Sequence, residues 1–234
     1  MMKTRSIGLL ALALAFLFGD AGNSFAADSN VTVSASSTAT ATVVCNVPAP
    51  EGATVLWNGR DLTGWTFHLS DTNINPADVW SVHDGALRIT GKPNGYLRSE
   101  QAFSNYVLHV EWRWLATNGN SGVLVHINGP DKVWPESVEA QLRSGSAGEV
   151  IGLGTDFDGP VINNRKRAKI AQSSEHPVGE WNAYDIVCQG NTMKVSVNGV
   201  PKNQVEQMSV TSGSVGLQSE GAPIEFRNVW VKPL

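Results

Sequence analysis

Three segments of the sequence carry ionisable side chains at a spacing that could place them together on one face of a β-sheet. Residues 106–115, 122–128 and 137–143 alternate apolar with polar side chains, and successive side chains of a strand point to opposite faces. The apolar set predicts the buried face of each segment. The opposite face then carries these side chains: His109, Glu111, Arg113, Leu124, His126, Glu139, Gln141 and Arg143. Charges of both signs beside an amide and an imidazole are typical of a ligand-binding or proton-transferring groove.

This cluster forms only if the three segments are neighbours in one sheet, which their order along the chain favours. A solvated outer face of mixed charge is the alternative, since any antiparallel sheet can expose one. A divalent cation is a further option, because His126, Glu139 and Glu111 could supply nitrogen and oxygen ligands. No ligand spacing in the sequence requires a metal.

The surrounding sequence predicts an all-β domain. From Val55 onward, short β-branched and aromatic runs alternate with clusters of Gly, Asn, Asp and Pro, and no amphipathic stretch persists at the helical period. Asp84-Gly85 and Asn198-Gly199 predict two tight hairpins, since both residues of each pair tolerate positive φ. We expect strands near residues 79–83, 86–90, 96–99, 106–115, 122–128, 137–143, 183–189, 192–198, 214–219 and 223–232, with mostly loops over 143–180. About ten antiparallel strands in roughly 180 residues favour a jelly-roll sandwich of two antiparallel sheets.

The N-terminal residues predict a secretory signal. Lys3 and Arg5 precede an apolar run over residues 7–18, and small residues suited to cleavage follow at Ser24 and Ala26. The run is about a dozen residues long, which is short of the roughly 20 that span a bilayer as a helix. We therefore expect residues 1–26 to be removed and the protein to be exported to the periplasm or the medium, without membrane insertion.

The composition of the chain indicates its domain boundaries and limits the classes of partner that it can bind. Residues 27–52 are rich in Ser, Thr and Ala and predict a linker or a loosely attached edge segment, whereas residues 53–234 predict one domain. The formal net charge of −4 provides no basic field to attract nucleic acid or an anionic membrane. Cys45 and Cys188 are the two cysteines, and the sequence leaves open whether they form a bridge.

Motifs spread along the chain resemble a known family. They are Leu56-Trp57-Asn58-Gly59-Arg60-Asp61-Leu62-Thr63-Gly64-Trp65, Tyr96-Leu97-Arg98-Ser99-Glu100, Glu111-Trp112-Arg113, Asn120-Ser121-Gly122-Val123, Glu139-Ala140-Gln141-Leu142, Gly216-Leu217-Gln218-Ser219-Glu220-Gly221 and Ile224-Glu225-Phe226-Arg227-Asn228-Val229. In this order and spacing they resemble the 3-keto-disaccharide hydrolase domain family, over nearly the whole chain after the signal. The resemblance implies a concanavalin-like jelly roll with a sugar site on its concave sheet. Many members carry Asp-His after Leu-Gln, whereas this chain has Ser219-Glu220, so no role of that histidine is carried over.

The resemblance also implies cleavage of glycosides that are oxidised at C3. The ketone acidifies the C2 proton, so a base can remove it, the C1 oxygen can leave by elimination, and hydration yields the 3-keto sugar. On the predicted face we expect Glu139 to be the base, Arg113 to stabilise the enediolate oxygen and His126 to protonate the leaving oxygen. The expected substrate-binding residues are Glu111, Asn120, Gln141, Arg143 and Trp134.

The sequence allows alternative roles for Trp134 and alternative functions for the domain. Trp134 lies in a proline-bounded loop, where it either stacks on a sugar or packs within the loop. An ordinary glycosidase with Glu111 and Glu139 as its two carboxylates is an alternative enzyme, because only the need for a 3-keto group separates the two reactions. A carbohydrate-binding module is the non-enzymatic alternative, since jelly rolls serve both functions.

Overall fold

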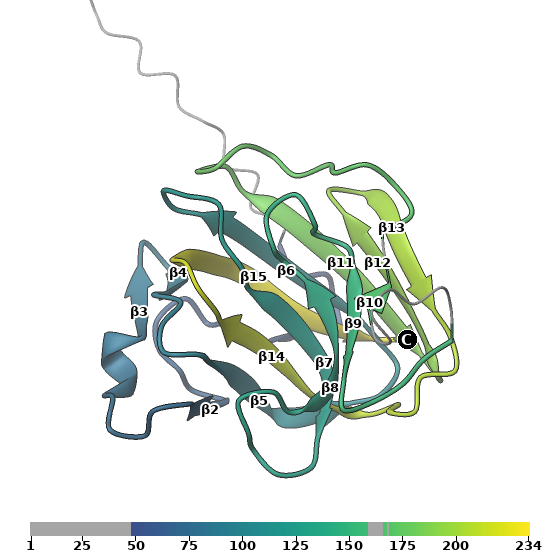
Figure 1. Ribbon diagram of the computed structural model, residues 1–234, viewed down its shortest axis with the longest axis horizontal. Coiled ribbons are helices and arrows are strands. Elements are labelled where there is room, and N and C mark those ends of the chain that lie inside the picture. The colour runs from purple at the N-terminus through teal and green to yellow at the C-terminus, as the bar shows by residue number, and fades with distance from the viewer. Residues whose placement is uncertain (1–47, 159–165, 168) are drawn as a thin grey trace, which may run out of the picture. The chain divides into compact units, whose positions relative to one another are not determined.

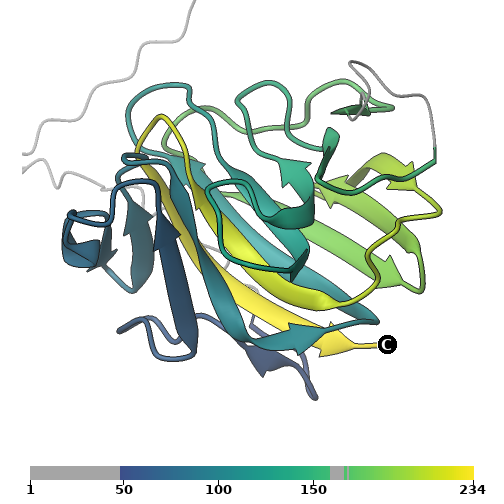
Figure 2. The same cartoon turned by 60° about the horizontal axis from the view of Figure 1, so that its bottom comes forward.

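The computed structural model describes residues 48–158, the backbone of residues 166–167, and residues 169–234. These residues form two antiparallel β-sheets that lie face to face (Figure 1, Figure 2). Sheet A has the spatial order β13 (Val200–Val205), β12 (Thr192–Val197), β11 (Asn182–Gln189), β6 (Tyr106–Trp114), β15 (Ile224–Pro233), β4 (Ala86–Ile89) and β3 (Trp80–His83), with β1 (Thr54–Val55) paired to β15. Sheet B has the order β10 (Lys166–Arg167), β9 (Val150–Leu153), β8 (Glu136–Gln141), β7 (Gly122–Asn128), β14 (Gly213–Ser219), β5 (Gly95–Phe103) and β2 (Trp65–Leu69). The one helical element in the described ranges is a 3-10 turn, η1 (Pro76–Asp78), so the predicted all-β sandwich is confirmed.

The core lies between the two sheets and is built by the alternating apolar side chains. Leu108, Val110 and Trp112 of β6 face inward from sheet A and are fully buried. Val123 and Val138 face them from sheet B and are fully buried as well. Each such side chain contributes about 1.5–3 kcal/mol on burial, so the alternation fixes which face of each strand points outward.

The chain changes sheet between β6 and β7. β6 pairs with β11 and β15 in sheet A, whereas β7 pairs with β8 and β14 in sheet B. The prediction that the three polar segments are neighbours in one sheet is therefore wrong. The physical reason is that the inward faces of β6 and β7 are both apolar and pack against each other across the core, so their polar faces point in opposite directions.

All ten predicted strands are present. The strand predicted at residues 96–99 is longer than expected and extends to Phe103. Asp84 and Asn198 have φ of 50° and 51°, and each is followed by a glycine with positive φ, which confirms both hairpins. Five strands were not predicted: β1, β2, β9, β10 and β13. Most of them are short or lie at or near a sheet edge. β9 contains Gly152 and β13 contains Pro201, and both residue types weaken the signal of a strand in the sequence.

Several sequence predictions concern residues 1–47, which lie outside the described residues, including the signal and most of the segment 27–52. Cys45 lies there too, so the open question of a bridge is not addressed by the structure. Cys188 lies in the core, where burial raises the pKa of its thiol to about 12. No helix in the described part of the chain is both long and apolar enough to cross a bilayer.

Candidate functional site

The outer face of sheet B, called the site face below, carries polar side chains in adjacent rows across β14, β7 and β8. Leu124 lies opposite Glu139 in one row. In the next row Gly122 lies opposite Gln141, and the pairing of β14 with β7 brings Gln218 beside Gly122. These three strands therefore place one carboxylate and two amides on the same outer face, because their opposite face packs into the core.

Glu139 and Gln218 lean toward each other over Gly122. A Cβ atom built on residue 122 would stand 2.5 Å from Glu139 Oε1 and 2.6 Å from Gln218 Oε1. The absence of a side chain at Gly122 thus leaves the space that these two side chains share. Both are buried, with exposed fractions of 3% for Glu139 and 1% for Gln218.

Gln218 is the residue of the site that the sequence reasoning missed. Neither its Oε1 nor its Nε2 has a hydrogen-bond partner in the described structure, although both atoms are buried. A buried polar group left in that state costs about 1–3 kcal/mol, so such groups are usually satisfied by a ligand or by water. The Leu217-Gln218 motif was visible in the sequence, but its strand had not been assigned to this face. The neighbouring Gln141 accepts a hydrogen bond at 2.8 Å from the backbone N–H of Arg143, so its amide N–H groups remain available as donors.

Asn120 and Glu220 extend the site face beyond the Gln218 row. They are paired in an isolated β-bridge, and their side chains are hydrogen-bonded. Burial raises the pKa of the Glu220 carboxyl, and the hydrogen bond from Asn120 opposes this only in part. Arg143 is exposed directly after β8, with its Nη2 3.5 Å from Ser146 Oγ. The structure therefore keeps Glu139 and Gln141 on one face, as predicted, and places Asn120 at the rim of that face.

His126 does not lie on the site face, because β7 contains a β-bulge. The pairing of β7 with β8 shifts register between Val125 and Asn128, and His126 has a φ of 56°. As a result Leu124 and Ile127 share one face, where a strictly alternating strand would separate them. The prediction that His126 points outward is wrong for this reason.

The surroundings of His126 also oppose the predicted proton-donor role. The ring is fully buried, meets the core residue Tyr106 edge-on with centroids 5.7 Å apart, and has Nδ1 3.2 Å from the backbone oxygen of Val210. Burial lowers the pKa of the imidazole, so the neutral form is favoured near neutral pH. His126 is thus a core residue of the sandwich.

Glu111 and Arg113 lie on the outer face of sheet A, on the opposite side of the domain from Glu139. Arg113 donates from Nε to Glu225 Oε2 at 2.7 Å, and Arg88 binds Oε1 of the same carboxylate at 2.7 Å. Glu111 accepts hydrogen bonds from Arg227 Nε at 2.6 Å and from Asn228. The predicted roles of Arg113 in stabilising the enediolate and of Glu111 in binding hydroxyls are therefore corrected: both residues belong to a network of buried ion pairs.

The same network includes a histidine with a perturbed pKa. His109 Nδ1 lies 2.8 Å from Asp185 Oδ1, its Nε2 lies 3.7 Å from a carboxylate oxygen of Glu111, and its ring stacks on Trp230 at 4.9 Å. Burial lowers the pKa of His109, but the two carboxylates outweigh burial and raise it to about 9. The protonated ring is thus part of the network that stabilises sheet A.

The loop between β7 and β8 crosses the site face. Asp131 in this loop accepts a hydrogen bond from Tyr96 Oη at 2.7 Å and pairs with Arg98 at 3.2 Å, and both of these residues belong to β5. Since β14 lies between β7 and β5, the loop must pass over β14 to reach them. Trp134 in the same loop is 39% exposed, and its stacking on a sugar stays a prediction.

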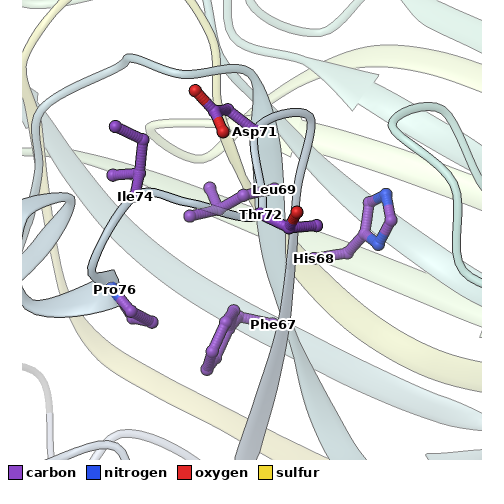
Figure 3. Close-up of a pocket in the computed structure, with 7 residues that line it drawn as sticks. All are labelled: Phe67, His68, Leu69, Asp71, Thr72, Ile74 and Pro76. Atoms are coloured by element: carbon purple, nitrogen blue, oxygen red, sulfur yellow. The ribbon is translucent and has the colours of Figure 1, made fainter.

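A small pocket lies at the edge strand β2. It has a volume of about 210 Å³ and is lined by Phe67, His68, Leu69, Asp71, Thr72, Ile74 and Pro76. Figure 3 shows that the His68 ring points away from Phe67, Ile74 and Pro76. His68 lies opposite Tyr96, and Tyr96 lies opposite Gln218, so His68 stands at the edge of the Gln218 row while its ring turns away from the apolar side chains of the pocket.

The described residues contain no group of three or more His, Cys, Asp or Glu side chains arranged to hold a metal ion. The predicted ligand set of His126, Glu139 and Glu111 is separated by the fold, because Glu111 lies on sheet A and His126 points into the core. That ligand set is therefore corrected.

Solved structures with a similar fold come from several organisms. A candidate glycosyl hydrolase of Parabacteroides distasonis has a TM-score of 0.60 at 22% identity, over 79% of this chain and 94% of its own. The β-glucanase of Bacillus licheniformis has a TM-score of 0.53 at 18% identity, over 78% and 98%. The carbohydrate-binding module CBM66 of Bacillus subtilis has a TM-score of 0.51 at 14% identity, over 71% and 93%. At these identities the likeness shows the fold, a concanavalin-like jelly roll.

No curated protein sequence matches the chain. Residues 52–232 match the family described as the 3-keto-alpha-glucoside-1,2-lyase-like domain, and this range includes every strand of sheet B. The fold and the match together indicate a glycosyl hydrolase-like or carbohydrate-binding jelly roll. The chain belongs to the 3-keto-alpha-glucoside-1,2-lyase-like domain family.

Proposed function

We propose that the protein cleaves glycosides whose sugar carries a ketone at C3, by elimination followed by hydration. The observation that carries the proposal is the convergence of the Glu139 carboxylate with the buried, unsatisfied amide of Gln218 over Gly122. A carboxylate positioned beside hydrogen-bond donors suits removal of a proton next to a ketone, because the donors stabilise the oxyanion that forms. Family membership supports the same substrate class.

In this proposal Glu139 removes the C2 proton. The electrons form the enediolate, and the amide N–H groups of Gln218 and Gln141 donate to its oxygen in place of the guanidinium that the sequence had suggested. The C1–O bond then breaks, the leaving oxygen takes a proton, and water adds across the C1=C2 bond to give the free 3-keto sugar. Asn120, Gln141 and Arg143 bind sugar hydroxyls at the rim of the same face.

The experiment compares a 3-keto-glucoside with its unoxidised parent glucoside, with and without a chelator. We expect aglycone release from the keto substrate alone, accompanied by the absorbance of an enone-type glycal. Release from the parent would instead identify an ordinary glycosidase, and chelator sensitivity would add a metal ion. Glu139→Gln should reduce kcat/KM by about 10²–10⁴-fold without preventing folding. Glu100→Gln, which changes an exposed carboxylate on β5, is the matched control.

A carbohydrate-binding module is the second candidate, favoured by the unsatisfied Gln218 amide, since amides are suitable ligands for sugar hydroxyls. It predicts binding of a 3-keto sugar without turnover, in the wild type as well as in Glu139→Gln.

For the location of the protein, we propose export through the N-terminal signal, which mass spectrometry of the secreted mature N-terminus would test.

A further inference from the structure

Glu220 occupies a fixed position at the end of β14, two residues beyond Gln218. The preceding Ser219 donates from Oγ to the backbone oxygen of Pro93 at 2.9 Å, and the following Gly221 donates from its N–H to the backbone oxygen of Gly91 at 2.7 Å. The Glu220 side chain is held on its other side by Asn120. Its backbone is thus anchored on both sides, and the carboxyl group is partly buried at the rim of the site face.

The Glu139 carboxyl and Glu220 lie at neighbouring rows of the site face, which suits two groups that act on adjacent carbon atoms of one sugar. Glu139 Oε1 reaches the space above Gly122, and Asn120, the partner of Glu220, is two residues from Gly122 on the same chain segment. Gln218 and Glu220 are two residues apart, as are Gly122 and Asn120, so Asn120 and Glu220 form the next row of the site face, roughly 6.6 Å along the strands from the row of Gln218 and Gly122. A sugar ring that covers both rows has C2 toward Glu139 and C1 toward Glu220.

Asn120 has the geometry of a group that orients the acid. Its bond to Glu220 uses its amide group as the donor, while its Oδ1 is buried without a partner in the described structure. Asn120 therefore holds the Glu220 carboxyl at the rim of the site face through one oxygen, and the second oxygen can carry a proton. Burial favours this protonated form, since it raises the pKa of the carboxyl.

We propose that Glu220 is the catalytic residue that protonates the leaving oxygen, a role that rests on the proposed function. As Glu139 takes the C2 proton and the C1–O bond breaks, the Glu220 O–H bond breaks and its proton goes to the departing oxygen. The products are the free alcohol or sugar and the 3-keto glycal, and Glu220 is left as a carboxylate. Water then adds across C1=C2: its O–H proton returns to Glu220 as its oxygen bonds C1, and Glu139 returns its proton to C2. Both residues thereby regain their starting states.

The test compares two leaving groups in Glu220→Gln. A 4-nitrophenyl 3-keto-glucoside releases a stable phenolate that needs no proton, whereas a methyl 3-keto-glucoside releases an alkoxide that does. We expect kcat/KM for the methyl substrate to fall by about 10²-fold or more, while kcat/KM for the nitrophenyl substrate stays within roughly fivefold of the wild type. Glu100→Gln should change neither value, since its carboxylate is exposed on β5.

Two further measurements keep the inference open to refutation. Glu220→His should recover part of the methyl activity, because an imidazolium can also donate a proton. Equal loss on both substrates in a folded Glu220→Gln protein, judged by its thermal unfolding, would overturn the role of Glu220, and so would an unchanged methyl activity. Failure of the proposed function looks different: the wild type itself would then cleave neither keto substrate.

Discussion

The space above Gly122 provides a direct test of the site face. In Gly122→Ala the new Cβ would stand 2.5 Å from Glu139 Oε1, 2.6 Å from Gln218 Oε1 and 2.8 Å from Glu139 Cγ. Comfortable contacts between non-bonded heavy atoms are about 3.5–4.0 Å, so both side chains must move by about 1 Å. A displacement of that size at catalytic groups lowers activity by about 10²-fold, which corresponds to about 2.7 kcal/mol of barrier.

The stability of the variant should fall much less than its activity. Gly122 is not among the glycines with positive φ, so alanine can adopt its backbone conformation. An extra methyl group in a packed site costs about 1–3 kcal/mol, and the lower entropy of the unfolded chain returns about 0.4–1 kcal/mol. We therefore expect a net loss of about 1–2 kcal/mol and a folded protein.

The assay combines kcat/KM on a 3-keto-glucoside with thermal unfolding followed by circular dichroism. The double variant Gly122→Ala/Gln218→Ala removes one of the two displaced side chains, so it should regain stability without regaining activity. A folded Gly122→Ala protein with wild-type kcat/KM would refute the placement of Glu139 and Gln218 at the reacting sugar.

Three further predictions concern residues that the fold removes from the site. In the wild type the pKa of His109 is about 9 in the folded state and about 6.5 in the unfolded state. The protonated ring therefore contributes up to about 3 kcal/mol to the free energy of unfolding. This contribution is complete below pH 6.5, declines as the pH rises and is lost above pH 9. Chemical denaturation at pH 6 and pH 10 should show this loss, and His109→Gln should remove it. Arg113→Ala breaks one of the two arginine pairs of Glu225 and should cost about 1.5–3 kcal/mol of stability while leaving kcat/KM of the folded protein within about twofold. His126→Asn keeps a residue that tolerates positive φ and should also retain kcat/KM; a 10²-fold loss without unfolding would restore His126 to the mechanism.

Much of the fold followed from local patterns in the sequence. The alternation of Val138 and Ala140 with polar neighbours identified a strand, and Asp84-Gly85 identified a hairpin, because each signal depends on residues close together in the chain. The face of Glu139 and Gln141 was also predicted correctly, since their strand has no irregularity within 136–141.

The remaining parts of the site depend on contacts between distant segments. His126 was assigned to the wrong face because a single bulge residue reverses the alternation, and a bulge leaves no clear mark in one sequence. Arg113 was assigned to the wrong sheet because the order of strands along the chain does not determine where a sandwich changes sheet. Gln218 and Glu220 reach the site through β14, which lies about 90 residues from β7 in the chain and pairs with it only in the folded domain.

The separation of charged groups between the two outer faces has a consequence for how this domain can evolve. The ion pairs around Glu225 and Glu111 lie on sheet A, and the polar groups of the site face lie on sheet B, with the apolar core between them. Substitutions on one face therefore share no partners with the other, and their free energies should add. Residues of the site face such as Glu220 could therefore be substituted during evolution to suit a different leaving group or sugar. The ion pairs of sheet A would be unaffected and would offset the stability lost by such substitutions.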